Sequence, residues 1–132
     1  MTRTKIAPLA LGAVLLGGLA FGPAIAHHSV SAQFDYDRPF AVKGTLSKIE
    51  WINPHSYLRV VVMEGGKQVT WNIESHGIQG MRKVGLDKEV LKVGNIYEVK
   101  GYRARNGTPS GYLTQLITAD GKVFNKSTED PN

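Results

Sequence analysis

The 132-residue chain contains no cysteine. Without cysteine, a protein has no disulfide bonds, no lipid anchor attached through a thiol and no thiolate metal site. The stability of this chain must therefore come from a packed core, and any bound metal would need nitrogen, oxygen or methionine ligands. Internal repeats and low-complexity segments are missing as well, and the length is that of one domain.

Recognisable catalytic motifs are also absent. The chain has no Ser-His-Asp order, no glycine-rich phosphate loop and no His-Glu-x-x-His helix. Glu50 and Glu74 follow apolar alternations and would end neighbouring strands, where we expect them to be solvated charges. The sequence therefore favours a binding function over an enzymatic one.

Positive charge and apolar residues are unevenly placed at the start of the chain. Arg3 and Lys5 precede an apolar run at residues 6–21, which a Gly-Pro pair then interrupts. Residues 24–26, Ala-Ile-Ala, have the small-x-small form of a signal peptidase site. The pattern predicts a cleaved secretory signal peptide at residues 1–26.

Cleavage after Ala26 would leave His27 as the first residue of a 106-residue mature chain in the periplasm. The apolar run is shorter than the roughly 20 residues that span a bilayer, so we expect no stable membrane anchor. Loss of Arg3 and Lys5 would leave 14 basic and 11 acidic residues, a net charge of +3. Neither this charge nor the compartment suits a nucleic-acid partner.

The mature chain divides into three predicted parts. Residues 27–39 are polar without a sustained period and predict an N-terminal arm, in which Phe34 and Tyr36 share a parity and would lie on the domain. Residues 40–124 alternate between apolar and polar positions, which predicts a mainly β, that is all-β, domain. Residues 125–132 predict a flexible tail.

The first strand of this domain is predicted to be long and bent. Phe40, Val42 and Leu46 share one face, and the apolar parity then shifts to Ile49 and Trp51. A change of parity by one residue within a strand indicates a β-bulge. A long bent first strand is typical of a small closed barrel.

The remaining alternations and turn residues predict a short series of elements after the first strand. Three strands, a short helix and two strands is the element order of a five-stranded OB-like Greek-key barrel, with an open antiparallel sandwich as the alternative. The predicted elements are strands at 57–63 and 69–74 joined at Gly65-Gly66, a helix at 76–84 capped by Ser75 and ended by Gly85, strands at 96–105 and 112–119, and an edge strand at 122–124.

The corner at residues 51–55, Trp-Ile-Asn-Pro-His, separates the first two strands. It presents His55, one of only four histidines in the chain. In a site built around this histidine, Trp51 would form a packing wall, and Asn53 and Pro54 would give rigid support.

Several short motifs stand out along the mature chain. They are Ala26-His27-His28-Ser29, Lys43-Gly44-Thr45-Leu46, Trp51-Ile52-Asn53-Pro54-His55, the run from Gly94 to Gly101, and Asp120-Gly121. Together they resemble the motifs of a family of small exported bacterial proteins of unknown function. The resemblance covers the mature chain and implies export and a small β-domain. It marks His27, His28 and His55 as motif positions and implies no role for His76.

These histidines predict a metal site. Cleavage would give His27 a free α-amine beside its imidazole, and an amine with a pKa near 7.7–8.0 can deprotonate near neutrality when a metal competes. His28 and His55 would supply further nitrogen ligands. Copper(II) is the first candidate and zinc the second. The alternative is a solvated His27-His28 end and a His55 that only bonds its own corner.

The competing hypothesis is a non-catalytic binding module. OB barrels often bind ligands on the face of their second and third strands. Tyr57, Arg59, Tyr102 and Arg103 would offer an aromatic and cationic patch to a protein partner or small ligand, whereas the parity of Trp71 places it in the core. Only the metal site depends on a free amine at His27.

Overall fold

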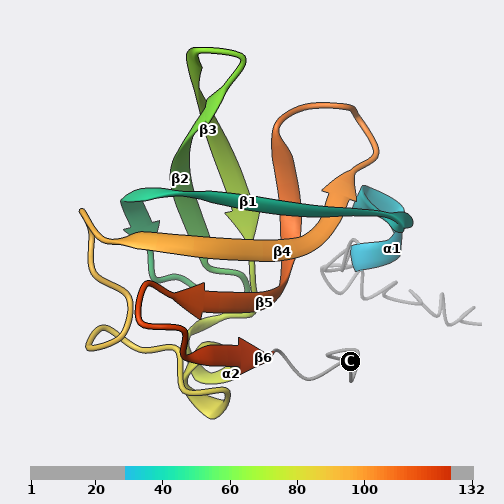
Figure 1. Cartoon of the computed structure of the whole chain (residues 1–132). Helices are drawn as coiled ribbons and strands as arrows, with labels where there is room; N and C mark the ends of the chain where they lie inside the picture. Colours follow the sequence, from blue (N-terminus) through green and yellow to red (C-terminus); the bar gives the residue numbers. More distant parts are fainter. Residues whose placement is uncertain (1–28, 126–132) are drawn as a thin grey trace, which may run out of the picture.

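The computed structural model describes residues 29–125. These residues form six strands and two short helices (Figure 1). No helix among them combines the length and apolar character that crossing a bilayer requires. The elements are α1 (Val30–Gln33), β1 (Phe34–Glu50), β2 (Tyr57–Glu64), β3 (Lys67–Glu74), α2 (Ile78–Lys83), β4 (Ile96–Ala104), β5 (Ser110–Thr118) and β6 (Val123–Asn125).

Five strands close into a ring. Antiparallel neighbours run in the order β3-β2-β1-β4-β5, and a parallel pairing between β3 and β5 joins the two ends of this series. The pairing sets residues 72–74 opposite residues 110–112. This ring confirms the predicted OB-like barrel and excludes the open sandwich. The short strand β6 pairs only with β5, outside the ring.

The bend in β1 follows the predicted parity change. Leu46 pairs with Val60 of β2, but the next paired residue is Lys48, so Ser47 is the extra residue of a β-bulge. Leu46 is fully buried and Ile49 is half-buried after the bulge. The bulge lets β1 pair with β4 along its first part and with β2 along its last part.

The start of β1 differs from the sequence-based expectation. The strand begins at Phe34 instead of Phe40, so part of the predicted arm is strand. Phe34 is buried against Tyr112, with ring centroids 5.3 Å apart, while Tyr36 is about half exposed and packs on Tyr102. A register shift between Asp35 and Pro39 breaks the alternation, which is why the pattern did not reveal this segment.

The interior of the barrel is one apolar cluster. Trp71 is buried as its parity predicted, and its ring stacks on Phe40 with centroids 4.9 Å apart. Burying each large apolar side chain stabilises the fold by about 1.5–3 kcal/mol. The buried members are Phe40, Leu46, Leu58, Val60, Val62, Trp71, Ile73, Met81, Leu86, Leu91, Tyr97, Val99, Leu113, Leu116 and Phe124.

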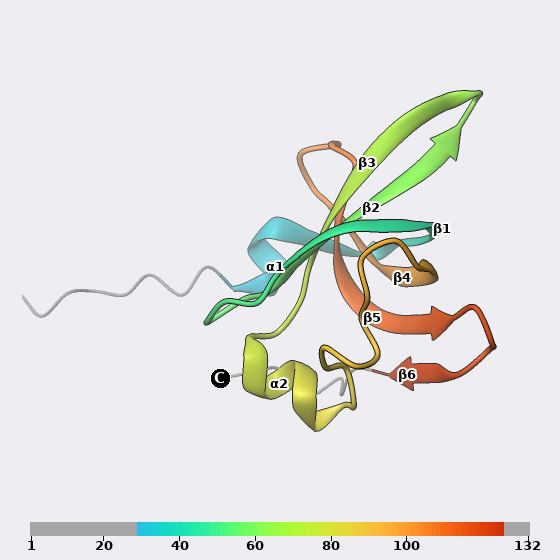
Figure 2. The ribbon, with the colours of Figure 1, turned by 90° about the vertical axis from the view of Figure 1, so that its left-hand side faces the viewer.

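Helix α2 covers the end of the barrel opposite the β2–β3 hairpin (Figures 1 and 2). It is shorter than the predicted helix at 76–84, and Gly77, not Ser75, is its N-cap residue. The first helical N–H, that of Ile78, donates to Oδ1 of Asn53 at 3.0 Å. A side chain from the corner therefore satisfies a helix end that the helix's own cap residue leaves open.

Ser75 has a different role from the predicted one. It is fully buried, and its hydroxyl donates to Sδ of Met81 at 2.8 Å. Met81 is itself buried in the core, so this contact holds the helix against the barrel. Gly85 has a φ of +83°, which agrees with the predicted end of the helix.

Candidate functional site

The corner after β1 is held against the segment that follows β3. The N–H of Ser56 donates to the carbonyl of His76 at 3.1 Å, and the N–H of Ser75 donates to the carbonyl of Ser56 at 2.9 Å. The Asn53–Pro54 peptide is cis, and Trp51 packs half-buried against the core. These contacts place the corner histidine, His55, beside the end of β3.

His55 is paired with a buried carboxylate. Its Nδ1 makes a short hydrogen bond with Oε1 of Glu74, the last residue of β3. The side chain of Glu74 is only 9% exposed, whereas that of His55 keeps 28% of its surface exposed. In the tautomer that carries its proton on Nδ1, His55 donates to this carboxylate and leaves Nε2 with a free lone pair.

The position of Glu74 corrects the expectation that both strand-end carboxylates are solvated. Glu74 is buried because β5 pairs with β3 at residues 72–74 and covers this end of the strand. The alternation of Trp71 and Ile73 places Glu74 on the other face of β3, where nothing in the local sequence indicates burial.

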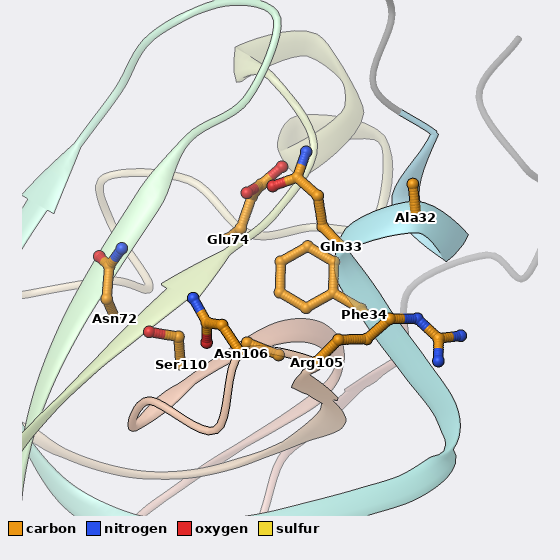
Figure 3. A pocket seen from close by; sticks show the side chains of 9 residues that line it. Ala32, Gln33, Phe34, Asn72, Glu74, Arg105, Asn106 and Ser110 are labelled. Carbon is orange, nitrogen blue, oxygen red and sulfur yellow. The ribbon is translucent and has the colours of Figure 1, made fainter.

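A pocket of about 360 Å³ with both polar and apolar lining residues adjoins this pair. It lies between α1, the end of β3 and the loop from β4 to β5, with Phe34 at its wall (Figure 3). Glu74 belongs both to this pocket and to the pair with His55. The other polar residues that line the pocket are Gln33, Asn72, Arg105, Asn106 and Ser110.

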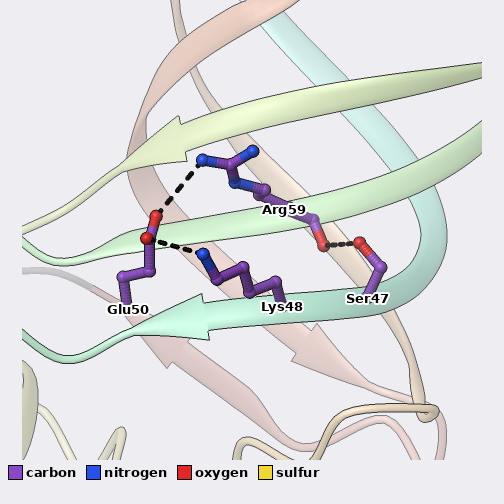
Figure 4. Close-up of polar contacts among 4 residues, drawn as sticks. All are labelled: Ser47, Lys48, Glu50 and Arg59. Carbon is purple, nitrogen blue, oxygen red and sulfur yellow. Dashed lines mark hydrogen bonds and ion pairs between the residues drawn. The ribbon is translucent and has the colours of Figure 1, made fainter.

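Glu50, unlike Glu74, is paired at the surface. Its carboxylate lies 2.8 Å from Nζ of Lys48 and 3.4 Å from Nη2 of Arg59 (Figure 4). The hydrogen bond from Lys48 lowers the pKa of Glu50 below its ordinary value. Ser47, the bulge residue, donates to the carbonyl of Arg59 at 3.0 Å. Exposed ion pairs of this kind contribute little to the stability of the fold.

The four residues of the alternative patch lie on two strands that flank β1 on opposite sides. On β2, Tyr57 pairs with Glu74 of β3, and burial, followed by the charges of Glu74 and Glu50, raises its pKa. On β4, Tyr102 packs on another tyrosine, with ring centroids 4.8 Å apart. Arg103 lies over the ring of Trp71, with Cζ 4.9 Å from the centroid. Tyr57, Tyr102 and Arg103 thus each lie beside a different residue of the barrel.

Of the predicted metal ligands, only His55 is among the described residues; His27 and His28 lie outside them. Within residues 29–125, no group of three or more histidine and acidic side chains could hold a metal ion. The His55–Glu74 pair offers one imidazole and one carboxylate. Ala32 and Gln33 of α1 line the same pocket as Glu74, so the start of the described chain lies near this pair.

Residues 17–114 match the family model DUF6152, described as a family of unknown function. The chain belongs to the DUF6152 family. This assignment agrees with the resemblance to an uncharacterised family inferred from the motifs. No curated protein matches the chain.

Among solved structures, one that is similar to this DUF6152 protein has low sequence identity to it. It is a ZRD-deleted mutant of TiaS in complex with agmatine, with a TM-score of 0.46 and 14% sequence identity. The likeness covers 70% of this chain and 23% of that chain, so the DUF6152 protein spans about a quarter of the other's length.

Sequence reasoning missed most of the pocket of the DUF6152 protein. Its lining comes from α1, β3 and the β4–β5 loop, which are far apart in the sequence. The polar residue types involved are common on any protein surface. Only the closure of the barrel brings them together. Of the lining residues, the sequence singled out Glu74 as a strand-end carboxylate and Phe34 as an arm residue expected to lie on the domain.

Proposed function

We propose that this protein binds a divalent transition metal ion in the periplasm, copper first and zinc second, through His27, His28 and His55. The proposal includes removal of residues 1–26, which frees the α-amine of His27. The observation that supports it best is the hydrogen bond between Nδ1 of His55 and the buried Glu74.

The carboxylate prepares His55 to be a ligand. Metal-binding histidines usually donate their second ring N–H to a carboxylate, which fixes the tautomer and makes the ligating nitrogen more basic. Here Glu74 holds Nδ1, so Nε2 is the atom that would bind the metal. Copper(II) and zinc both accept imidazole nitrogen.

A short stretch of chain separates the N-terminal ligands from helix α1. Two residues separate His27 from Val30, the first residue of α1, and the three residue steps from His27 to Val30 span at most roughly 10 Å. Helix α1 lies at the pocket that Glu74 lines. A histidine α-amine and imidazole together form a chelate, to which His28 and His55 would add nitrogen ligands.

A copper(II) titration tests this function. The chain is expressed with residues 1–26, and intact mass spectrometry checks that the purified protein begins at His27. We expect one equivalent of copper(II) to bind by calorimetry, with nitrogen ligands in the electron paramagnetic resonance spectrum. Loss of an imidazole ligand in His55→Ala should weaken binding by more than tenfold, and Glu74→Gln should weaken it by roughly 10–100-fold.

The matched control carries one additional glycine before His27, which removes the chelating α-amine from the histidine and leaves the fold unchanged. We expect its affinity to fall as well. If His55→Ala binds copper as tightly as the unmodified protein, the uptake belongs to a free His-His terminus and the proposed site is wrong.

A further inference from the structure

The pocket beside Glu74 has the chemistry of a second binding site, one that needs no metal. We propose that it binds a neutral, hydroxyl-rich ligand, of the size of a single sugar ring. Its volume of about 360 Å³ lies at the lower end of the range for small-molecule sites. The inference rests on what each wall of the pocket can donate or accept, and it does not depend on the proposed copper site.

One wall accepts hydrogen bonds. Oε1 of Glu74 is taken by His55, which leaves the second carboxylate oxygen for the pocket. Figure 3 shows this carboxylate beside the amide of Gln33, above the ring of Phe34. Because Glu74 is almost fully buried, a ligand group that meets it must donate a hydrogen bond to offset its desolvation.

The opposite wall donates hydrogen bonds. Oδ1 of Asn106 already accepts from the N–H of Thr108 at 3.1 Å and from its hydroxyl at 2.7 Å. The amide NH₂ of Asn106 is therefore the free end, and Figure 3 shows its nitrogen turned toward the pocket. Ser110 adds a hydroxyl on the same wall, 3.1 Å from that of Thr108.

The guanidinium of the arginine at the edge of the pocket bonds to groups outside its interior. Nε of Arg105 donates to the carbonyl of Ser31 at 3.1 Å, and Nη1 lies 3.7 Å from the carboxylate of Asp35. Figure 3 shows the guanidinium directed away from the other lining residues, so only the stem of Arg105 faces the pocket. Among the described residues that line the pocket, Glu74 is then the one acidic side chain, and no basic group faces the interior.

These walls discriminate between ligand classes. An anion would be repelled by Glu74, and a cation would pair with Glu74 but could not accept from Asn106. A hydroxyl both donates and accepts, so neighbouring hydroxyls of one ligand satisfy both walls. This complementarity assigns the pocket to polyols and sugars.

The test is a titration of isotope-labelled full chain followed by amide chemical shifts, in buffer with a metal chelator. The probes are glucose, galactose and N-acetylglucosamine, with ethylammonium and acetate as charged comparators. We expect at least one sugar to shift the amides of residues 33, 74, 106 and 110 with a millimolar dissociation constant. Absence of such shifts with every sugar, or stronger shifts with either comparator, overturns the proposal.

Two variants locate the binding, with a third as control. Asn106→Asp keeps the oxygen that Thr108 needs but replaces the donating NH₂, so sugar affinity should fall roughly tenfold. Ser110→Ala should also weaken binding while removing only a hydroxyl. Asn95→Asp makes the same change in an exposed loop outside the pocket and should have no effect. Unchanged affinity in both pocket variants would overturn the assignment.

The chelator separates this result from the copper titration. Sugar binding that persists without metal supports the pocket whatever the outcome for copper. Copper uptake without any sugar shift supports the metal site alone and rejects the pocket.

Discussion

At the scale of single residues, Tyr57 links the site to pH. Burial and the nearby charges of Glu74 and Glu50 raise its pKa above the ordinary value of about 10. Between the unfolded and folded pKa values, the unfolded state has lost the phenolic proton that the folded state still holds. The contribution of Tyr57 to the free energy of unfolding is therefore greatest below pH 10 and falls as the pH rises beyond it.

Tyr57→Phe should remove this alkaline loss, because phenylalanine has no proton to release. We expect the difference in urea midpoint between the variant and the unmodified protein to grow in the variant's favour from pH 9 to pH 11. Tyr36→Phe is the control, since it removes the same hydroxyl from a ring that is half exposed. Parallel pH profiles for Tyr57→Phe and the unmodified protein would contradict this account.

Glu74, also at the scale of single residues, shows why the environment of a residue cannot always be predicted from the local sequence. Its neighbours along the chain indicate a solvent-facing strand end, yet β5 covers it and His55 pairs with it. Burial of a charge depends on residues from another strand, which a local pattern does not contain.

At the scale of elements, the connection between the corner and α2 is the feature most open to a stability test. Asn53 accepts from the N–H of Ile78, and the cap residue Gly77 offers no side chain for this purpose. Asn53→Ala should therefore lower the free energy of unfolding by about 1 kcal/mol, as for the loss of a helix cap. Urea denaturation measures the change.

Asn95→Ala is the matched control for this prediction. Asn95 is an exposed asparagine before β4, and its substitution should change stability by less than about 0.5 kcal/mol. Equal effects of the two substitutions would mean that the Asn53 contact does not stabilise α2.

The strands show how far alternation can be used. From Phe40 onward it identified each strand to within a few residues, and the parity change at Leu46 identified the bulge. It failed at residues 34–39, where polar residues and a register shift interrupt the period. Ser75 was wrongly expected to cap the helix because a serine before a helical pattern usually does so, whereas here its hydroxyl is buried against Met81.

At the scale of the whole molecule, the barrel closes at Gly111. This residue pairs with Ile73 of β3 and Arg103 of β4, and a Cβ there would collide with the ring of Phe40. The ring is buried and stacked on Trp71, so it cannot move aside freely. Gly111→Ala should therefore destabilise the protein by about 1–3 kcal/mol, the usual effect of overpacking.

A double-mutant cycle with Phe40→Leu isolates the cause. Leucine lacks the ring atoms that meet the new Cβ, so Gly111→Ala should have a smaller effect in that background than alone. Thermal or urea denaturation of the four proteins gives the coupling. Additive effects would show that the Phe40 ring is not what requires glycine at this position.

The sequence by itself determined the mainly β class, the order of the elements, the turns and the corner that carries His55. These features depend on the period of apolar residues and on turn chemistry, both of which are local. Only the tertiary structure decided that β3 joins β5, that Glu74 is buried beside His55, and that α1 and the β4–β5 loop form a pocket with them. These are contacts between distant segments, set by closure of the barrel, and no local period encodes them.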